Sequence, residues 1–91
     1  MLDINIASGK YSHAENLGTH ASGDYSHAEG RGTKASLNCC HAEGDNSEAE
    51  GEASHAEGMQ TRASGMASHV EGLTSFAGGI SSHAEGNNSQ A

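Results

Sequence analysis

The chain has 91 residues and a formal net charge of −8, which is enough length for one small domain. Val, Ile, Leu and Phe together number only nine, and 14 of the other apolar residues are Ala, so composition alone favours disorder. No apolar stretch is long enough for a membrane-spanning helix or a signal peptide, and four basic residues against twelve acidic ones argue against nucleic acid or an anionic membrane as a partner.

A strict repeat follows residues 1–4, which we expect to form a short lead-in, so that the repeat domain spans residues 5–91. A period of 14 residues aligns six copies related to Ser-His-Ala-Glu-Gly without any insertion or deletion. Seven residues after each start comes a weaker copy, Ser or Thr followed by Ala two residues later. This periodicity indicates a repeat architecture and outweighs the composition. The copies begin at residues 12, 26, 40, 54, 68 and 82.

Each half-repeat predicts a short β-strand followed by a corner. A helix is excluded because Ala recurs only every seven residues, with Gly nearby, so no helical face would be apolar. In a strand, Ser12 and Ala14 point to one side while His13 and Glu15 point to the other. Coils with two strands each, stacked about 4.8 Å apart, would form an all-β parallel β-solenoid about 29 Å tall for six coils. Its interior would hold only Ser, Thr and Ala.

Several positions depart from this pattern. Asn16 and Leu37 stand where the repeat otherwise has Gly. Asn accepts left-handed backbone, whereas Leu at such a corner would be strained, so we expect an irregular third coil. Cys40 takes an inward Ser position beside Cys39 at a corner, and both are expected to be free thiols.

The Ser-x-Ala-x-Gly units at a 14-residue period resemble the head repeats of trimeric autotransporter adhesins, the YadA-like β-roll. The Ser-His-Ala-Glu-Gly copies are also similar to repeats in appendage and tail-fibre proteins of phages and prophages infecting Gram-positive bacteria. The resemblance covers residues 5–91 and implies a left-handed parallel β-roll that assembles as a homotrimer. It also implies an extracellular location, on a bacterial surface or a virion. The adhesin heads carry aliphatic residues at the two outward positions where this chain has His and Glu.

The outward His and Glu residues recur in every coil, which suggests that they meet something equally repetitive, namely further copies of the chain. We expect His of one chain to pair with Glu of a neighbour in a polar ladder that fixes register. An alternative is a divalent transition metal or another ion on the threefold axis, held by residues among His27, Glu29, His41, Glu43, His55, Glu57, His69 and Glu71. No other cofactor is expected. The expected trimer seam consists of His13, Glu15, His27, Glu29, His41, Glu43, His55, Glu57, His69, Glu71, His83 and Glu85.

The second outward face varies from coil to coil and carries Lys34, Arg62 and Phe76. These three residues are candidates for binding a host-surface protein or glycan. Catalysis is not expected, because neighbouring Ser and His point to opposite sides of a strand and the six copies offer no distinctive site. We therefore expect a spacer or adhesive head within a fibre, without membrane insertion. The repeat begins and ends without a capping element, which suggests a piece of a longer protein.

Overall fold

The computed structural model describes residues 5–91, so the expected lead-in at residues 1–4 lies outside the described residues. All regular structure in this range is β-strand, and short strands alternate with long ones along the chain. No helix in the described range is long and apolar enough to cross a membrane. The short strands are β1 (Ile6–Ala7), β3 (His20–Ala21), β5 (Lys34–Ala35), β7 (Glu48–Ala49), β9 (Arg62–Ala63) and β11 (Phe76–Ala77). The long strands are β2 (His13–Leu17), β4 (His27–Arg31), β6 (His41–Asp45), β8 (His55–Met59), β10 (His69–Leu73) and β12 (His83–Asn87).

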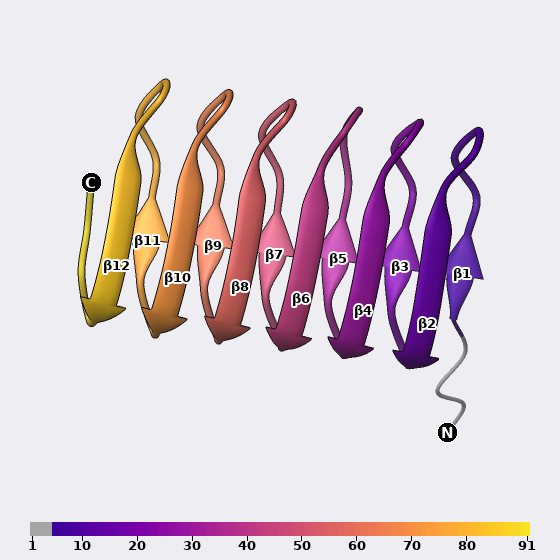
Figure 1. Ribbon diagram of the computed structural model, residues 1–91, viewed down its shortest axis with the longest axis horizontal. Helices are drawn as coiled ribbons and strands as arrows, with labels where there is room; N and C mark the ends of the chain where they lie inside the picture. Colours follow the sequence, from indigo (N-terminus) through magenta and orange to yellow (C-terminus); the bar gives the residue numbers. More distant parts are fainter. Residues whose placement is uncertain (1–4) are drawn as a thin grey trace.

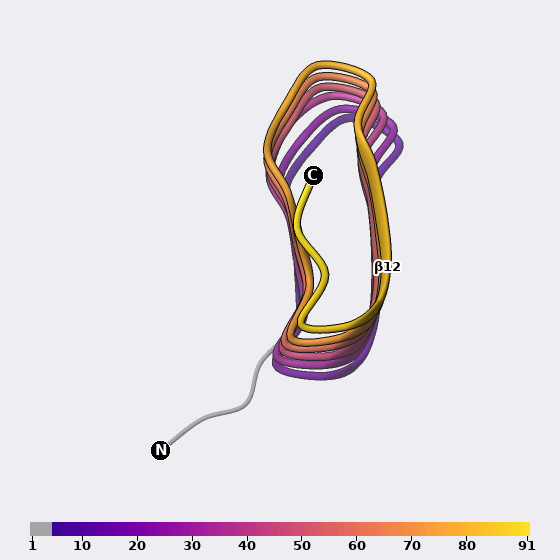
Figure 2. The same ribbon diagram turned by 90° about the vertical axis from the view of Figure 1, so that its left-hand side faces the viewer.

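The strands form two parallel six-stranded sheets, one from all the short strands and one from all the long strands (Figure 1). Each strand pairs with the equivalent strand 14 residues away, so that His27 lies beside His41 and Ala28 beside Ala42. Viewed along the stack, the coils superimpose as one flattened ring (Figure 2). The predicted all-β parallel solenoid of about six 14-residue coils, with two strands per coil, is therefore confirmed.

The interior is made of small side chains in columns, as the alternation of the strands predicts. Ala and Val70 are buried there beside Ser, Thr and Cys40. Most of the inward hydroxyls bond to backbone carbonyls, as when Thr33 Oγ1 donates to the Glu29 carbonyl at 3.0 Å. No buried side-chain nitrogen or oxygen in the described range lacks a hydrogen-bond partner. A buried methyl group contributes only about 1 kcal/mol, so backbone hydrogen bonds between coils carry much of the cohesion.

Three positions in each coil have left-handed backbone. One of them follows the Glu of the long strand, where φ is 108° at Gly30 and 87° at Asn16. The expectation that Asn16 accepts left-handed backbone is therefore confirmed. The other two accept many residue types, including Tyr25 with φ of 60°. The Tyr25 amide donates to the Lys10 carbonyl of the preceding coil at 2.7 Å, and such bonds hold these corners in place.

The expectation of left-handed strain at Leu37 is wrong, because the positive φ in that corner belongs to Cys39, at 59°. The other coils have Gly at the position of Leu37, because successive coils approach each other closely at this corner. A Cβ added at Gly23 would lie 1.9 Å from the Leu37 carbonyl oxygen. The third coil is nevertheless locally different. Ser26 Oγ donates to the Gly23 carbonyl three residues back, whereas Cys40 Sγ contacts the Gly51 carbonyl of the next coil at 2.8 Å.

Candidate functional site

The most regular surface of the molecule is the outward side of the long-strand sheet, which we call the His/Glu face. His and Glu occupy the first and third positions of each long strand and therefore point to the same side. The parallel register places each His beside the His of the next coil, and most of the Glu residues align in the same way. The face consists of the twelve residues that the sequence predicts for the trimer seam, and it forms one His column and one Glu column.

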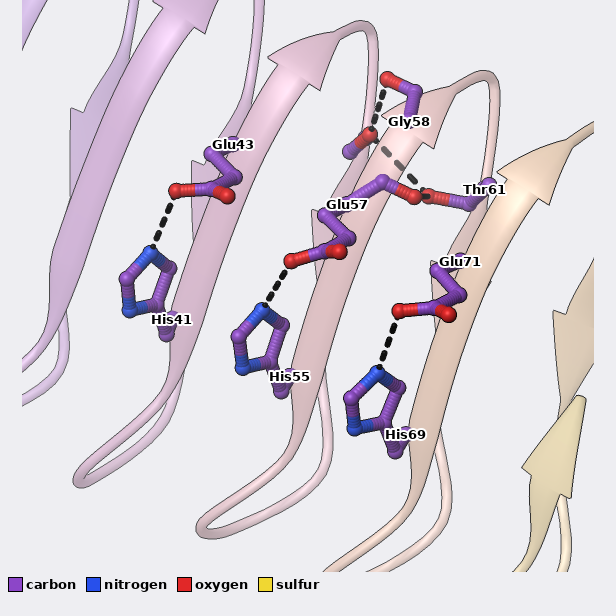
Figure 3. A network of polar contacts seen from close by, with 9 residues as sticks. His41, Glu43, His55, Glu57, Gly58, Thr61, His69 and Glu71 are labelled. Carbon is purple, nitrogen blue, oxygen red and sulfur yellow. Dashed lines mark hydrogen bonds and ion pairs between the residues drawn. The ribbon is translucent and has the colours of Figure 1, made fainter. Parts of the chain in front are cut away.

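Each His bonds to the Glu two residues later in its own strand. His41 Nε2 lies 2.9 Å from Glu43 Oε1, and His55 Nε2 lies 2.8 Å from Glu57 Oε1 (Figure 3). The same contact recurs in all six coils, between 2.7 Å at His13 and 3.1 Å at His69. The sequence expectation was a bond between chains. Within the single chain, the partner is the Glu of the same strand, because residues i and i+2 of a strand share a face and are close enough to pair.

The His rings stack along the column. Centroids of neighbouring rings lie between 4.5 and 4.9 Å apart, and the ring planes differ by 1° to 13°. The spacing follows from the distance between parallel strands, which is about 4.8 Å. Figure 3 shows that the ring nitrogen not bonded to Glu points away from the carboxylate in each repeat. Each ring thus keeps one nitrogen for a contact outside its own strand.

The His/Glu face is half-buried in the middle of the stack. The side chains of His55 and Glu57 are 34% and 33% exposed, so both columns remain accessible from outside. The hydrogen bond from His41 holds the pKa of the Glu43 carboxyl below its usual value, although partial burial opposes this effect. The carboxylate is therefore the stable form of Glu43 at neutral pH.

A groove runs beside the Glu column across the coils. It is lined by Asn16 and by the successive Glu and Gly residues of the other long strands. Gly forms its floor in every coil but the first, where Asn16 stands, and a Cβ added at Gly44 would lie 2.0 Å from the carbonyl oxygen of Gly58. Sequence reasoning missed this groove. The signal was the Gly that follows Glu in nearly every long strand.

Donor atoms suited to a metal ion come together at three places on the face. In each group, one ligand atom per residue lies within 4.8 Å of the others. Each group brings three donors together within a single chain; the sequence analysis expects ligands from three chains. Of the eight expected ligands, only Glu57 is in none of the groups. The groups are His41, Glu43 and His55; His69, Glu71 and His83; and Glu15, His27 and Glu29.

The three candidate binding residues of the variable face lie on the short-strand sheet, but the structure does not gather them into one site. Lys34 Nζ lies 4.0 Å from Glu48 Oε2, and Arg62 Nε lies 3.2 Å from Glu48 Oε1. A hollow on this sheet includes Arg62 and Phe76 but not Lys34. Both cations are thus partly neutralised by the same carboxylate.

The sequence analysis does not identify one exposed ion pair. Arg31 Nη2 lies 2.7 Å from Asp45 Oδ2 in the next coil, and the hydrogen bond raises the pKa of Arg31 and lowers that of Asp45. The two cysteines are free, with Cys39 exposed and Cys40 buried.

Comparison with known proteins places the chain in no established family. No model of a known protein family matches it, and no curated protein is similar to it in sequence.

Proposed function

We propose that this chain is a structural and adhesive fibre module, a shaft or head segment displayed outside a bacterial cell or on a virion. In this proposal the coils form a left-handed roll, and three copies assemble side by side around a threefold axis. The observation that carries the proposal is the His/Glu face, which repeats without change over six coils while the opposite sheet varies. No catalytic step is part of the proposed function.

The small interior supports association. Ala, Ser and Thr side chains bury little apolar surface, whereas ordering the backbone costs about 1–2 kcal/mol per residue. A solenoid of this composition gains stability when a neighbouring copy covers one of its faces. The His/Glu face suits this role because a contact made by one coil is repeated by the next in the same register.

The polar character of the face sets the kind of interface. Each His already bonds to the Glu of its own strand. Contacts with a sister chain are therefore made by the outer ring nitrogen of His and the second carboxylate oxygen of Glu. Such charge-assisted and polar contacts fix register and partner choice more than they add affinity. The Gly-floored groove leaves room for side chains of a neighbouring copy.

In this assembly, the short-strand sheet is the surface available to a host protein or glycan. Arg62 and Phe76 border one hollow there, which makes them the first residues to replace in an adhesion assay. Lys34 is the third candidate and lies two coils away from Arg62, with Glu48 on the coil between them.

Sedimentation velocity tests the assembly. The wild-type chain should sediment as a trimer, and the double variant His55→Ala with His69→Ala should shift toward monomer. His20→Ala is the matched control, because His20 lies on the short-strand sheet, and it should stay trimeric. A folded wild-type monomer at high concentration would contradict the proposal.

The second candidate is a column of metal or other ions on the threefold axis, with ligands from three chains. The closeness of His and Glu donors favours cation binding of some kind. Each group already brings three donors together within a single chain, so the geometry also suits an ion on the face of one subunit.

A further inference from the structure

We propose that the His/Glu face of a single chain binds a row of divalent transition-metal ions such as Zn²⁺, each held by donors from two successive coils. This goes beyond the fibre function and does not depend on it, because no second chain supplies a ligand. It also differs from an axial column, in which each ion would be shared by three subunits.

The central group shows how one ion would be held. His41, Glu43 and His55 each offer one ligand atom, and these atoms lie within 4.8 Å of one another. Zn²⁺ binds His nitrogen and carboxylate oxygen at about 2.0–2.2 Å, in sites of three protein ligands plus water or four protein ligands. The donors must therefore close in by an ångström or so. Ring and carboxylate rotation can achieve this, because all three side chains are about one-third exposed.

The proton balance of this step is simple. In a neutral His41 that donates from Nε2 to Glu43, the proton sits on Nε2 and the other ring nitrogen is bare. On metal binding, Nε2 gives its lone pair to the ion and the proton moves to Nδ1, so the imidazole remains neutral and changes tautomer. The hydrogen bond from His41 to Glu43 is exchanged for two bonds to the metal.

The repeat sets the number of ions. Each group takes its donors from two successive coils, and no coil contributes to two groups. Six coils taken two at a time give at most three ions per chain, in agreement with the three groups that the structure brings together. The first group, Glu15, His27 and Glu29, has only one imidazole and should bind Zn²⁺ more weakly than the other two.

Electrostatics favours this occupancy. The Glu column follows a spacing of about 4.8 Å, so its charges repel one another unless a cation lies between them. Three divalent ions would add six positive charges and bring the formal net charge from −8 to −2. Mg²⁺ supplies the same charge but prefers oxygen ligands and retains its water, so the imidazoles should select Zn²⁺ over Mg²⁺.

Equilibrium dialysis against ZnCl₂ with excess Mg²⁺, followed by elemental analysis, measures the stoichiometry. We expect three zinc ions per chain for the wild type and two for the double variant Glu43→Gln with Glu57→Gln. The matched control Glu50→Gln with Glu52→Gln removes the same charge outside the face and should keep three. The absence of saturable zinc binding would overturn the proposal, and so would an equal loss of bound zinc in the two double variants. A trimeric wild type that binds two zinc ions per chain would also overturn it.

A measurement on the unmodified chain keeps the test independent of variant folding. Nuclear magnetic resonance of the imidazole nitrogens during a zinc titration should show shifts at the five His residues of the three groups, namely His27, His41, His55, His69 and His83. His20 on the opposite sheet is an internal control and should not move. Equal shifts at all seven His residues, or none, would contradict the site. The two proposals can fail separately. A trimer that binds no zinc would overturn the zinc site and leave the trimeric assembly standing. A monomer that binds zinc would overturn the trimeric assembly and leave the zinc site standing.

Discussion

His41 and His55 are 14 residues apart in sequence, yet their rings stack with centroids 4.5 Å apart and planes differing by 1°. This parallelism arises because the two residues are directly paired in adjacent parallel strands. An invariant residue on such a sheet becomes a straight column, and a repeated pair of residues becomes two columns side by side. The chemistry of the His/Glu face therefore belongs to the stack of coils and not to any single residue.

Close approach of the coils predicts very different effects of the same substitution in two successive coils. A Cβ added at Gly65 would lie 2.1 Å from the carbonyl oxygen of Gly79, whereas one added at Gly79 would make only ordinary contacts with Ser82. Gly65→Ala should therefore lower the free energy of unfolding by about 1–3 kcal/mol.

The matched variant Gly79→Ala should change the stability by about 0.5 kcal/mol or less. Urea unfolding followed by circular dichroism measures both. Leu37 shows that one coil tolerates a side chain at this position, at the expense of its regular corner, so Gly65→Ala should fold. Equal destabilisation of the two variants would mean that the coils do not stack as closely as described.

The His41 to Glu43 hydrogen bond predicts a loss of stability in acid. Because the pKa of Glu43 is lower in the folded chain than its ordinary value of 4.5, the folded state favours the carboxylate. The stabilisation is complete above that ordinary value and is lost as pH falls through the lower, folded value. Unfolding free energies measured between pH 2.5 and pH 6 should thus decline toward acid.

Glu43→Gln should flatten this pH dependence, because the amide does not titrate. Glu52→Gln removes an exposed carboxylate at a corner and should leave the wild-type slope unchanged. A wild-type stability that is constant over the acidic range, or a slope retained in full by Glu43→Gln, would show that the bond from His41 does not favour the charged form.

Much of the fold follows from the sequence because the repeat is strict. The alternation of a strand places Ala14 inward and His13 outward, and the structure has both arrangements. The partner of each His was not predictable from alternation alone. His and Glu two residues apart share a face, but only the rotamers show that the imidazole reaches the Glu of its own strand.

The corners were harder to predict. Gly23 and Gly30 look equivalent in the heptad pattern, and an added Cβ would meet a carbonyl of the next coil at both, yet only Gly30 has left-handed backbone, with a φ of 108°. A close approach between residues 14 apart depends on the path of the backbone, which a single repeat does not reveal. For the same reason, the sequence pointed to strain at Leu37, whereas the structure shows a rearranged corner around Cys40.

The central claim is that the His/Glu face is covered by sister copies. Carbodiimide labelling of carboxylates, read by mass spectrometry at increasing protein concentration, tests it most directly, because Glu57 is 33% exposed in the single chain. The account predicts that Glu57 becomes protected as the chains associate, while Glu52 at an exposed corner is labelled equally throughout. Labelling of Glu57 that stays as fast as that of Glu52 at every concentration would contradict it.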